Sequence, residues 1–232
     1  MRHSLLAIVL AASTIGPSGP GAAADPEHPT VVELFTAQGC AACPPADTAL
    51  GRLAGRRDVL PLSFSVTYWD RFGWSDPLAR PEFTERQHAY ARIGRREAGT
   101  PQFVINGRFA TTYRGDAELA RAIDAADRGM TGPAISVRRR WLRISADRRS
   151  AREGIVWLVD YDPRTIRTPV RAGRNGGRML EHRNVARSLR RLGAWRGESV
   201  SFRLPPPSSG LRRAMLVQSA DGGAIVAARV IG

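Results

Sequence analysis

The chain lacks a lysine, a second cysteine pair and a long apolar run beyond its N-terminus. Its 35 lysine-or-arginine positions are all arginine, a bias along the whole chain that is typical of codon composition. No second C-x-x-C is present, and His28, His88 and His182 have no ligand spacing relative to the first, so we expect no zinc site. No later stretch reaches ~18 consecutive apolar residues, so we expect no membrane span in the mature chain.

The N-terminus has the pattern of a signal peptide. Arg2 and His3 give it a basic start. The apolar stretch from Leu5 to Ala12 is too short to span a bilayer, and Ala22-Ala23-Ala24 matches an A-x-A cleavage site. We therefore predict that residues 1–24 are removed and that the mature protein is periplasmic or secreted, in a compartment where thiols commonly become disulfides. An uncleaved anchor is the alternative.

Charge divides the remaining 208 residues (232 − 24) into two parts. Residues 25–129 hold 13 arginines and 14 acidic residues, a balance of −1, whereas residues 130–232 hold 21 arginines and 7 acidic residues, a balance of +14. The change coincides with a segment at 129–133 that contains glycine and proline. We therefore predict two domains, at residues 25–130 and 131–232.

The basic second part could attract an anionic surface or nucleic acid. Because exported proteins rarely meet nucleic acid, we expect no nucleic-acid partner. A contact with an anionic surface remains open beside the simpler alternative of a solvated basic face.

In the first part, apolar runs and turn signals predict an alternation of strands and helices. Pro44 and Pro81 each suit the first turn of a helix, and Asn106-Gly107 is a strong hairpin signal. The predicted order is strand 31–36, helix 44–53, strand 59–66, helix 81–96, strand 103–105, strand 108–113 and helix 116–128. This order is thioredoxin-like, so the predicted fold class is an α/β thioredoxin-like domain.

The sequence pattern of the second part predicts a small all-β, sandwich-like domain. Short apolar or alternating runs are separated by Gly, Pro, Ser and Asn. They comprise residues 155–161, 200–204, 214–218 and 224–231. A basic segment around Gly176-Gly177 has no assigned chemistry.

The pair Cys40 and Cys43 carries the redox chemistry that we predict. A C-x-x-C at a helix start places the first sulfur beside unpaired backbone N–H groups, which stabilise a thiolate together with the helix dipole. Cys40 is thus the predicted attacking nucleophile and Cys43 the resolving thiol. Ala41-Ala42 adds no charge, which argues against an extreme oxidant.

Two other roles for the pair are open. A purely structural disulfide closes so short a loop that it adds little stability. A two-thiolate Cu(I) site would suit a non-enzymatic binding module, because soft thiolates favour that ion.

Thr100, Pro101 and Glu33 complete the predicted site. Thr100-Pro101 opens the strand before the hairpin, where we expect a cis-proline against the disulfide and a docking surface for a partner peptide. Glu33 lies in the first strand, where a buried acid could accept a proton from the resolving thiol. An exposed Glu33 is the alternative.

The chain resembles an exported bacterial thioredoxin-like family known as domain of unknown function 1223. The resemblance covers nearly all of the mature chain and implies a thioredoxin-like fold without a substrate. Where many relatives have His and Asp on either side of Val66, this chain has Ser65 and Thr67. The matching stretches are residues 31–47, Tyr68-Trp69-Asp70, Gly73-Trp74, Asp76-Pro77, Phe83-Thr84-Glu85-Arg86-Gln87, Thr100-Pro101-Gln102, His182-Arg183-Asn184-Val185 and Leu192-Gly193-Ala194-Trp195.

The sequence therefore predicts a thiol–disulfide oxidoreductase that acts on exported thiol- or disulfide-containing proteins and needs no cofactor. A non-enzymatic Cu(I)-binding or protein-interaction module that uses the same fold is the alternative.

Overall fold

The computed structural model describes residues 23–147, 149 and 153–231. Most of the predicted signal peptide, residues 1–22, lies outside the described residues. Within them, no helix has both the length and the apolar character needed to cross a membrane.

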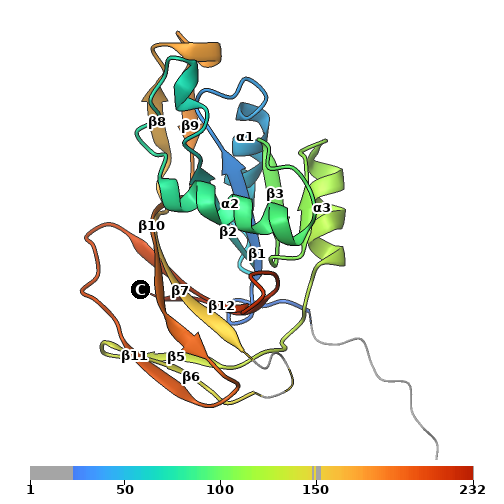
Figure 1. Cartoon of the computed structure of the whole chain (residues 1–232), viewed down its shortest axis with the longest axis vertical. Coiled ribbons are helices and arrows are strands. Elements are labelled where there is room, and N and C mark those ends of the chain that lie inside the picture. Colours follow the sequence, from blue (N-terminus) through green and yellow to red (C-terminus); the bar gives the residue numbers. More distant parts are fainter. Residues whose placement is uncertain (1–22, 148, 150–152, 232) are drawn as a thin grey trace, which may run out of the picture.

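An eight-stranded mixed sheet runs through the molecule (Figure 1). Strand β2 pairs in parallel with β1 on one side and with β10 on the other, and the remaining neighbours are antiparallel. In spatial order the strands are β13 (Ile225–Ile231), β12 (Arg212–Ser219), β7 (Gly154–Asp162), β10 (Val185–Trp195), β2 (Val59–Ser65), β1 (Thr30–Thr36), β3 (Gln102–Ile105) and β4 (Phe109–Thr111).

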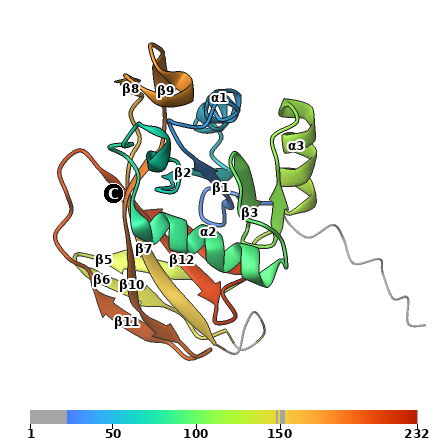
Figure 2. The same cartoon turned by 45° about the horizontal axis from the view of Figure 1, so that its top comes forward.

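Smaller elements flank this sheet. The described α-helices are α1 (Pro44–Leu53), α2 (Pro81–Ile93) and α3 (Asp116–Ala125), and two 3₁₀ turns are η1 (Asp70–Phe72) and η2 (Gly173–Asn175). A three-stranded sheet has the order β11 (Val200–Arg203), β6 (Trp141–Ile144), β5 (Ile135–Arg138), and β8 (Ile166–Pro169) pairs with β9 (Met179–His182). Figure 2 shows the three-stranded sheet and the β8–β9 hairpin at opposite ends of the molecule.

The predicted fold class, a thioredoxin-like α/β domain followed by a separate all-β domain, is wrong. The protein is mostly β, and strands from both parts of the chain share one sheet. The junction is the β2–β10 pair, where Val185 lies opposite Ser63 and the Ser63 N–H donates to the Asn184 carbonyl at 2.9 Å. An apolar run predicts a buried strand but does not say which distant strand pairs with it, so local patterns could not reveal this junction.

The individual elements of the first part are confirmed nearly as predicted, because each has a local signal. Helix α2 begins at the predicted Pro81 but ends at Ile93 rather than Arg96, and the hairpin turn lies at Asn106-Gly107. The four predicted strands of the second part correspond to β7, β11, β12 and β13. Strand β10 was not predicted, since its arginines and glycine interrupt any simple apolar alternation.

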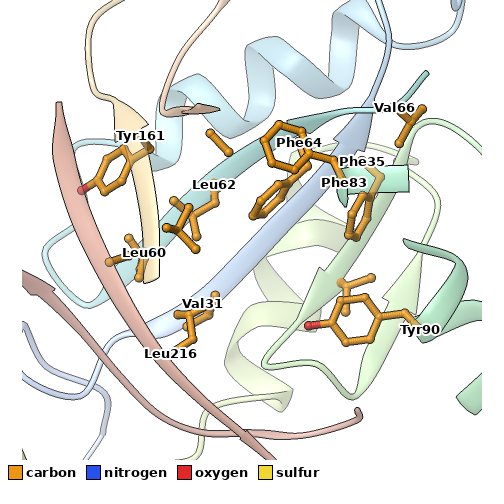
Figure 3. Close-up of a cluster of buried hydrophobic side chains, with 14 of the residues drawn as sticks. Val31, Phe35, Leu60, Leu62, Phe64, Val66, Phe83, Tyr90, Tyr161 and Leu216 are labelled. Carbon is orange, nitrogen blue, oxygen red and sulfur yellow. The ribbon is translucent and has the colours of Figure 1, made fainter. Parts of the chain in front are cut away.

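The largest core cluster lies between α2 and one face of the large sheet (Figure 3). Its members come from both parts of the chain, for example Phe35 and Phe64 from the first part and Tyr161 and Leu216 from the second. Both cysteines belong to this cluster. Burial of this shared apolar surface therefore stabilises the sheet across its junction.

The hairpin turn at Asn106 also ties the two parts together. Its side-chain oxygen accepts from the Val31 N–H at 2.8 Å, and its carbonyl accepts from the Ile225 N–H at 2.9 Å. At Gly107, which has a φ of 67°, a Cβ atom would lie 2.2 Å from the Gly223 carbonyl oxygen. The sequence therefore needs glycine here both for the turn and for the close approach of the β12–β13 turn.

A buried polar network connects β1, α2 and β12. The Arg86 Nε atom donates to Glu33 Oε1 at 2.6 Å, and the Tyr90 hydroxyl donates to Glu33 Oε2 at 2.6 Å. The Arg86 guanidinium also donates to Gln218 Oε1 and to the Tyr90 oxygen. Burial lowers the pKa of Arg86, but the attraction of Glu33 and Tyr90 and the hydrogen bond to Glu33 together more than offset it, so the pKa is raised and the guanidinium stays charged.

Removing one member of this network should destabilise the protein strongly. We predict that Arg86→Met lowers the free energy of unfolding by about 3–5 kcal/mol, because it leaves the Glu33 carboxylate buried and unpaired. The double variant Glu33→Gln with Arg86→Met should be more stable than Arg86→Met alone. Urea unfolding of the three proteins checks this, and a loss below about 1 kcal/mol in the single variant would contradict it.

Candidate functional site

The two cysteines form a disulfide between the end of β1 and the start of α1. Their Cα atoms are 5.4 Å apart, and Cys43 is the N-cap residue of α1, followed by Pro44. Cys40 is 1% exposed and Cys43 is fully buried, whereas Ala41 and Ala42 between them are exposed. The disulfide therefore lies just beneath the surface, and only the alanine loop faces solvent directly.

The structure brings Thr100 and Pro101 to the disulfide. The expected cis bond between them is confirmed, and the Thr100 carbonyl oxygen lies 3.6 Å from Cys40 Sγ. The Trp69 indole N–H donates to Thr100 Oγ1 at 2.7 Å. Two segments 60 residues apart in sequence thus meet at one sulfur atom, as the sequence predicts.

The sequence left open whether Glu33 is buried or exposed. The structure shows that it is buried, with a fractional exposure of 0%. Its described polar partners are Arg86 and Tyr90 on α2, and both of its carboxylate oxygens are engaged by them. The structure therefore places Glu33 in the network that joins the elements, and its expected proton-transfer role stays a prediction.

Aromatic side chains and an arginine pack beside the loop that leads into Cys40. A Cβ atom at Gly39 would lie 3.4 Å from the Trp69 Cβ atom, so Trp69 packs against the residue before Cys40. The Arg174 guanidinium lies 5.5 Å from the ring centroid of Trp69 and 5.8 Å from that of Phe72. Such cation–π contacts hold the Arg174 guanidinium against these two rings.

Asn175 fastens the loop that leads into Cys40. Its side-chain amide donates to the carbonyls of Gln38 and Cys40, each at 2.9 Å, and Arg178 donates to its Oδ1 atom at 2.7 Å. The Trp74 indole N–H donates to the Gln38 side chain at 2.9 Å. Asn175 is fully buried, so the β8–β9 hairpin of the second part forms a wall of the site.

A second buried group lies beside helix α1. The His182 Nδ1 atom at the end of β9 is 3.4 Å from Asp47 Oδ1, with both side chains at most 4% exposed. This distance indicates an ionic contact rather than a well-formed hydrogen bond, and His182 has no hydrogen-bond partner among the described residues. Asp47 Oδ2 accepts from the Thr36 hydroxyl at 3.0 Å.

The charges around His182 determine its protonation. Burial alone lowers the pKa of His182, but the attraction of Asp47, and then of Asp76, raises it above its ordinary value. Burial raises the pKa of Asp76, and the N–H groups of Gln38 and Leu78 partly offset this by donating to its carboxylate. The environment of α1 therefore favours a protonated imidazole.

Asp47, Asn175 and His182 were not among the site residues predicted from the sequence. A local signal existed only for Asp47, which follows Cys43 by one helical turn and so shares its helix face. Asn175 reaches the Cys40 carbonyl, and His182 reaches Asp47, through the β2–β10 pairing, for which no spacing in the sequence gives a sign.

Other features do not converge on the disulfide. A cavity of about 1080 Å³ lies near the end of α2 and includes Tyr90, Arg96 and Arg108 in its lining. Among the described residues, no group of three or more His, Cys, Asp or Glu side chains could hold a metal ion.

Comparison with known proteins gives a family and two similar structures. The family model described as "Protein of unknown function (DUF1223)" matches residues 31–218. A protein from Agrobacterium tumefaciens, known from its crystal structure, is 30% identical to this chain in sequence. The two structures have a TM-score of 0.72, over 90% of this chain and 94% of that chain. HBP35 of Porphyromonas gingivalis is 12% identical, with a TM-score of 0.56, over 88% of this chain and 75% of that chain, which shows a similar fold alone. No curated protein matches the chain.

The matched residues include the Cys40–Cys43 loop, the Thr100–Pro101 segment and the β8–β9 hairpin. The family model therefore spans both parts of the chain. The chain belongs to the DUF1223 family of proteins of unknown function, which the sequence resemblance predicted.

Proposed function

We propose that the protein exchanges thiols and disulfides with exported partner proteins through Cys40 and Cys43. The observation that carries this proposal is the contact of Cys40 Sγ with the Thr100 carbonyl, beside the N-cap of α1. A disulfide that only held the fold together would close a loop too short to contribute much stability. The proposed setting is the periplasm or the extracellular space.

The exchange balances as a two-electron transfer. In the reduced protein, the Cys40 thiolate attacks a partner disulfide, forms a mixed disulfide and releases one partner thiolate, which takes up a proton. Cys43, once deprotonated, attacks Cys40 Sγ and closes the intramolecular disulfide, so that the second partner sulfur leaves as a thiol. The partner gains two electrons and two protons. The reverse sequence oxidises a partner dithiol.

The surroundings of the disulfide support specific tasks. The N-terminal end of α1, which begins just after the Cys40–Cys43 loop, favours a thiolate at Cys40. Asp47 follows Cys43 by one turn and contacts the protonated His182, so the Asp47 carboxylate is the proposed acceptor for the Cys43 proton. In this proposal Pro101 and Thr100 shape the surface on which a partner segment docks, and Glu33 holds α2 in place.

Trapping tests the exchange directly. With Cys43→Ser, the mixed disulfide formed by Cys40 cannot be resolved, so partner proteins should accumulate as covalent adducts that a reductant releases. Non-reducing electrophoresis followed by mass spectrometry measures these adducts. The matched control Cys40→Ser lacks the attacking sulfur and should trap far less.

A redox titration of the wild-type protein with glutathione should show a reversible Cys40–Cys43 disulfide. Absence of both a reversible transition and a trapped partner would overturn the proposal. Stoichiometric Cu(I) binding to the reduced protein that also blocks exchange would favour the metal-binding alternative.

The buried His182–Asp47 contact predicts a pH-dependent stability of the oxidised protein. A raised pKa in the folded state contributes stability below the unfolded value of about 6.5 and loses it as pH rises through the folded pKa. The difference in unfolding free energy between wild type and His182→Gln should therefore shrink as pH rises above about 6.5. Urea unfolding across this pH range measures the difference, and a constant difference would contradict the assignment.

A further inference from the structure

The three-stranded sheet presents a basic outer face at the end of the molecule remote from the disulfide. The strand register places Arg138 and Arg203 on either side of Trp141, and all three side chains are exposed. The next outward row has Arg143 at its centre. Paired side chains on neighbouring strands lie about 5 Å apart, so the arginines flank the indole closely. Trp141 is 55% exposed, which is unusual for so large an apolar side chain.

A groove continues this face on one side. It has a volume of about 660 Å³, and its lining includes Arg140, Arg190, Arg191 and Arg203. Its remaining lining is largely apolar and comes from Leu189, Leu192, Leu204 and Pro205. The groove therefore combines guanidinium groups with apolar side chains.

The charge of this region is of one sign. Residues 135–143, 189–192 and 200–205 contain seven arginines and no acidic residue. Arg190 forms an ion pair with Asp160 at 2.8 Å, a carboxylate that also pairs with Arg213, but Arg138, Arg143 and Arg203 have no ion pair among the described residues. The arginine bias of the whole chain explains why the basic residues of this region are arginine rather than lysine. It does not explain the absence of acids here or the central tryptophan.

We propose that this basic outer face, defined by Arg138, Trp141, Arg143 and Arg203 with the adjoining groove, docks the protein on an anionic phospholipid bilayer. Guanidinium groups bind phosphate groups in bidentate fashion, and surface arginines are attracted to anionic lipids. Tryptophan suits the bilayer interface, where one end of its ring system is in apolar surroundings and the other is hydrated.

Nucleic acid fits this face less well. Surfaces that bind single strands use several aromatic side chains on which successive bases stack, whereas the outward positions of β5, β6 and β11 carry one aromatic residue, Trp141. The apolar lining of the groove suits the region beneath lipid headgroups rather than a sugar–phosphate backbone.

Docking by this face has a consequence for orientation. Figures 1 and 2 both show β5, β6 and β11 at one end of the molecule and α1 with the β8–β9 hairpin at the other. A protein held on a bilayer by the basic outer face would therefore direct the Cys40–Cys43 end away from the lipid. This inference does not depend on the redox proposal, since it concerns a different surface.

Vesicle binding tests the proposal with a charge-matched control. The full chain is mixed with vesicles of phosphatidylcholine alone, or of phosphatidylcholine with phosphatidylglycerol, and bound protein is measured by co-sedimentation. The anionic vesicles should bind more protein, and added salt should weaken this excess. Arg138→Ala with Arg203→Ala should weaken it by roughly 30-fold, whereas Arg92→Ala with Arg121→Ala, which removes the same charge from exposed helix positions, should leave it close to wild type.

A fluorescence measurement separates insertion of the indole from simple charge attraction. Binding should shift the tryptophan emission to shorter wavelength, and Trp141→Phe should lose most of this shift. Equal binding by the two double variants, or no preference for anionic vesicles, would overturn the proposal. So would binding of a single-stranded oligonucleotide through Arg138 and Arg203 without vesicle binding. Circular dichroism establishes that each variant is folded.

Discussion

The parallel pairing of β10 with β2 is the constraint on which the rest of the structure depends. Asn184 stabilises this pairing through two hydrogen bonds. Its carbonyl accepts from the Ser63 N–H at 2.9 Å, and its side-chain amide donates to the Pro61 carbonyl at 2.8 Å. Because β10 follows β9 directly in the chain, this pairing fixes where the β8–β9 hairpin lies. The hairpin is thereby placed against α1 and the disulfide loop.

The site is consequently built by both parts of the chain. The first part supplies the disulfide, the Thr100–Pro101 segment and Asp47, and the second supplies Asn175 and His182. Buried backbone carbonyls need hydrogen-bond partners, and Asn175 satisfies two of them in the loop before α1. The second part is therefore a structural component of the disulfide site, and its three-stranded sheet provides the separate surface for which we propose bilayer docking.

The features that depend on local patterns could be predicted from the sequence. Cys40, Cys43 and the cis Thr100–Pro101 bond were found from motif and position, and α1 and α2 from the prolines that open them. Strand β10 was missed because its inward and outward positions do not alternate simply, and its pairing with β7 contains two register shifts. Long-range pairing decides the fold class and the positions of Asn175 and His182, and neither hydrophobic periodicity nor residue spacing encodes it.

The most direct test of this account is the rate at which dithiothreitol reduces the Cys40–Cys43 disulfide in Asn175→Ala. Loss of the two buried hydrogen bonds should loosen the loop, expose Cys40 Sγ and accelerate reduction, while Arg171→Ala on the exposed surface of the same segment should not change the rate. If Asn175→Ala folds and its disulfide is reduced at the wild-type rate, the second part does not control the site and the account is contradicted.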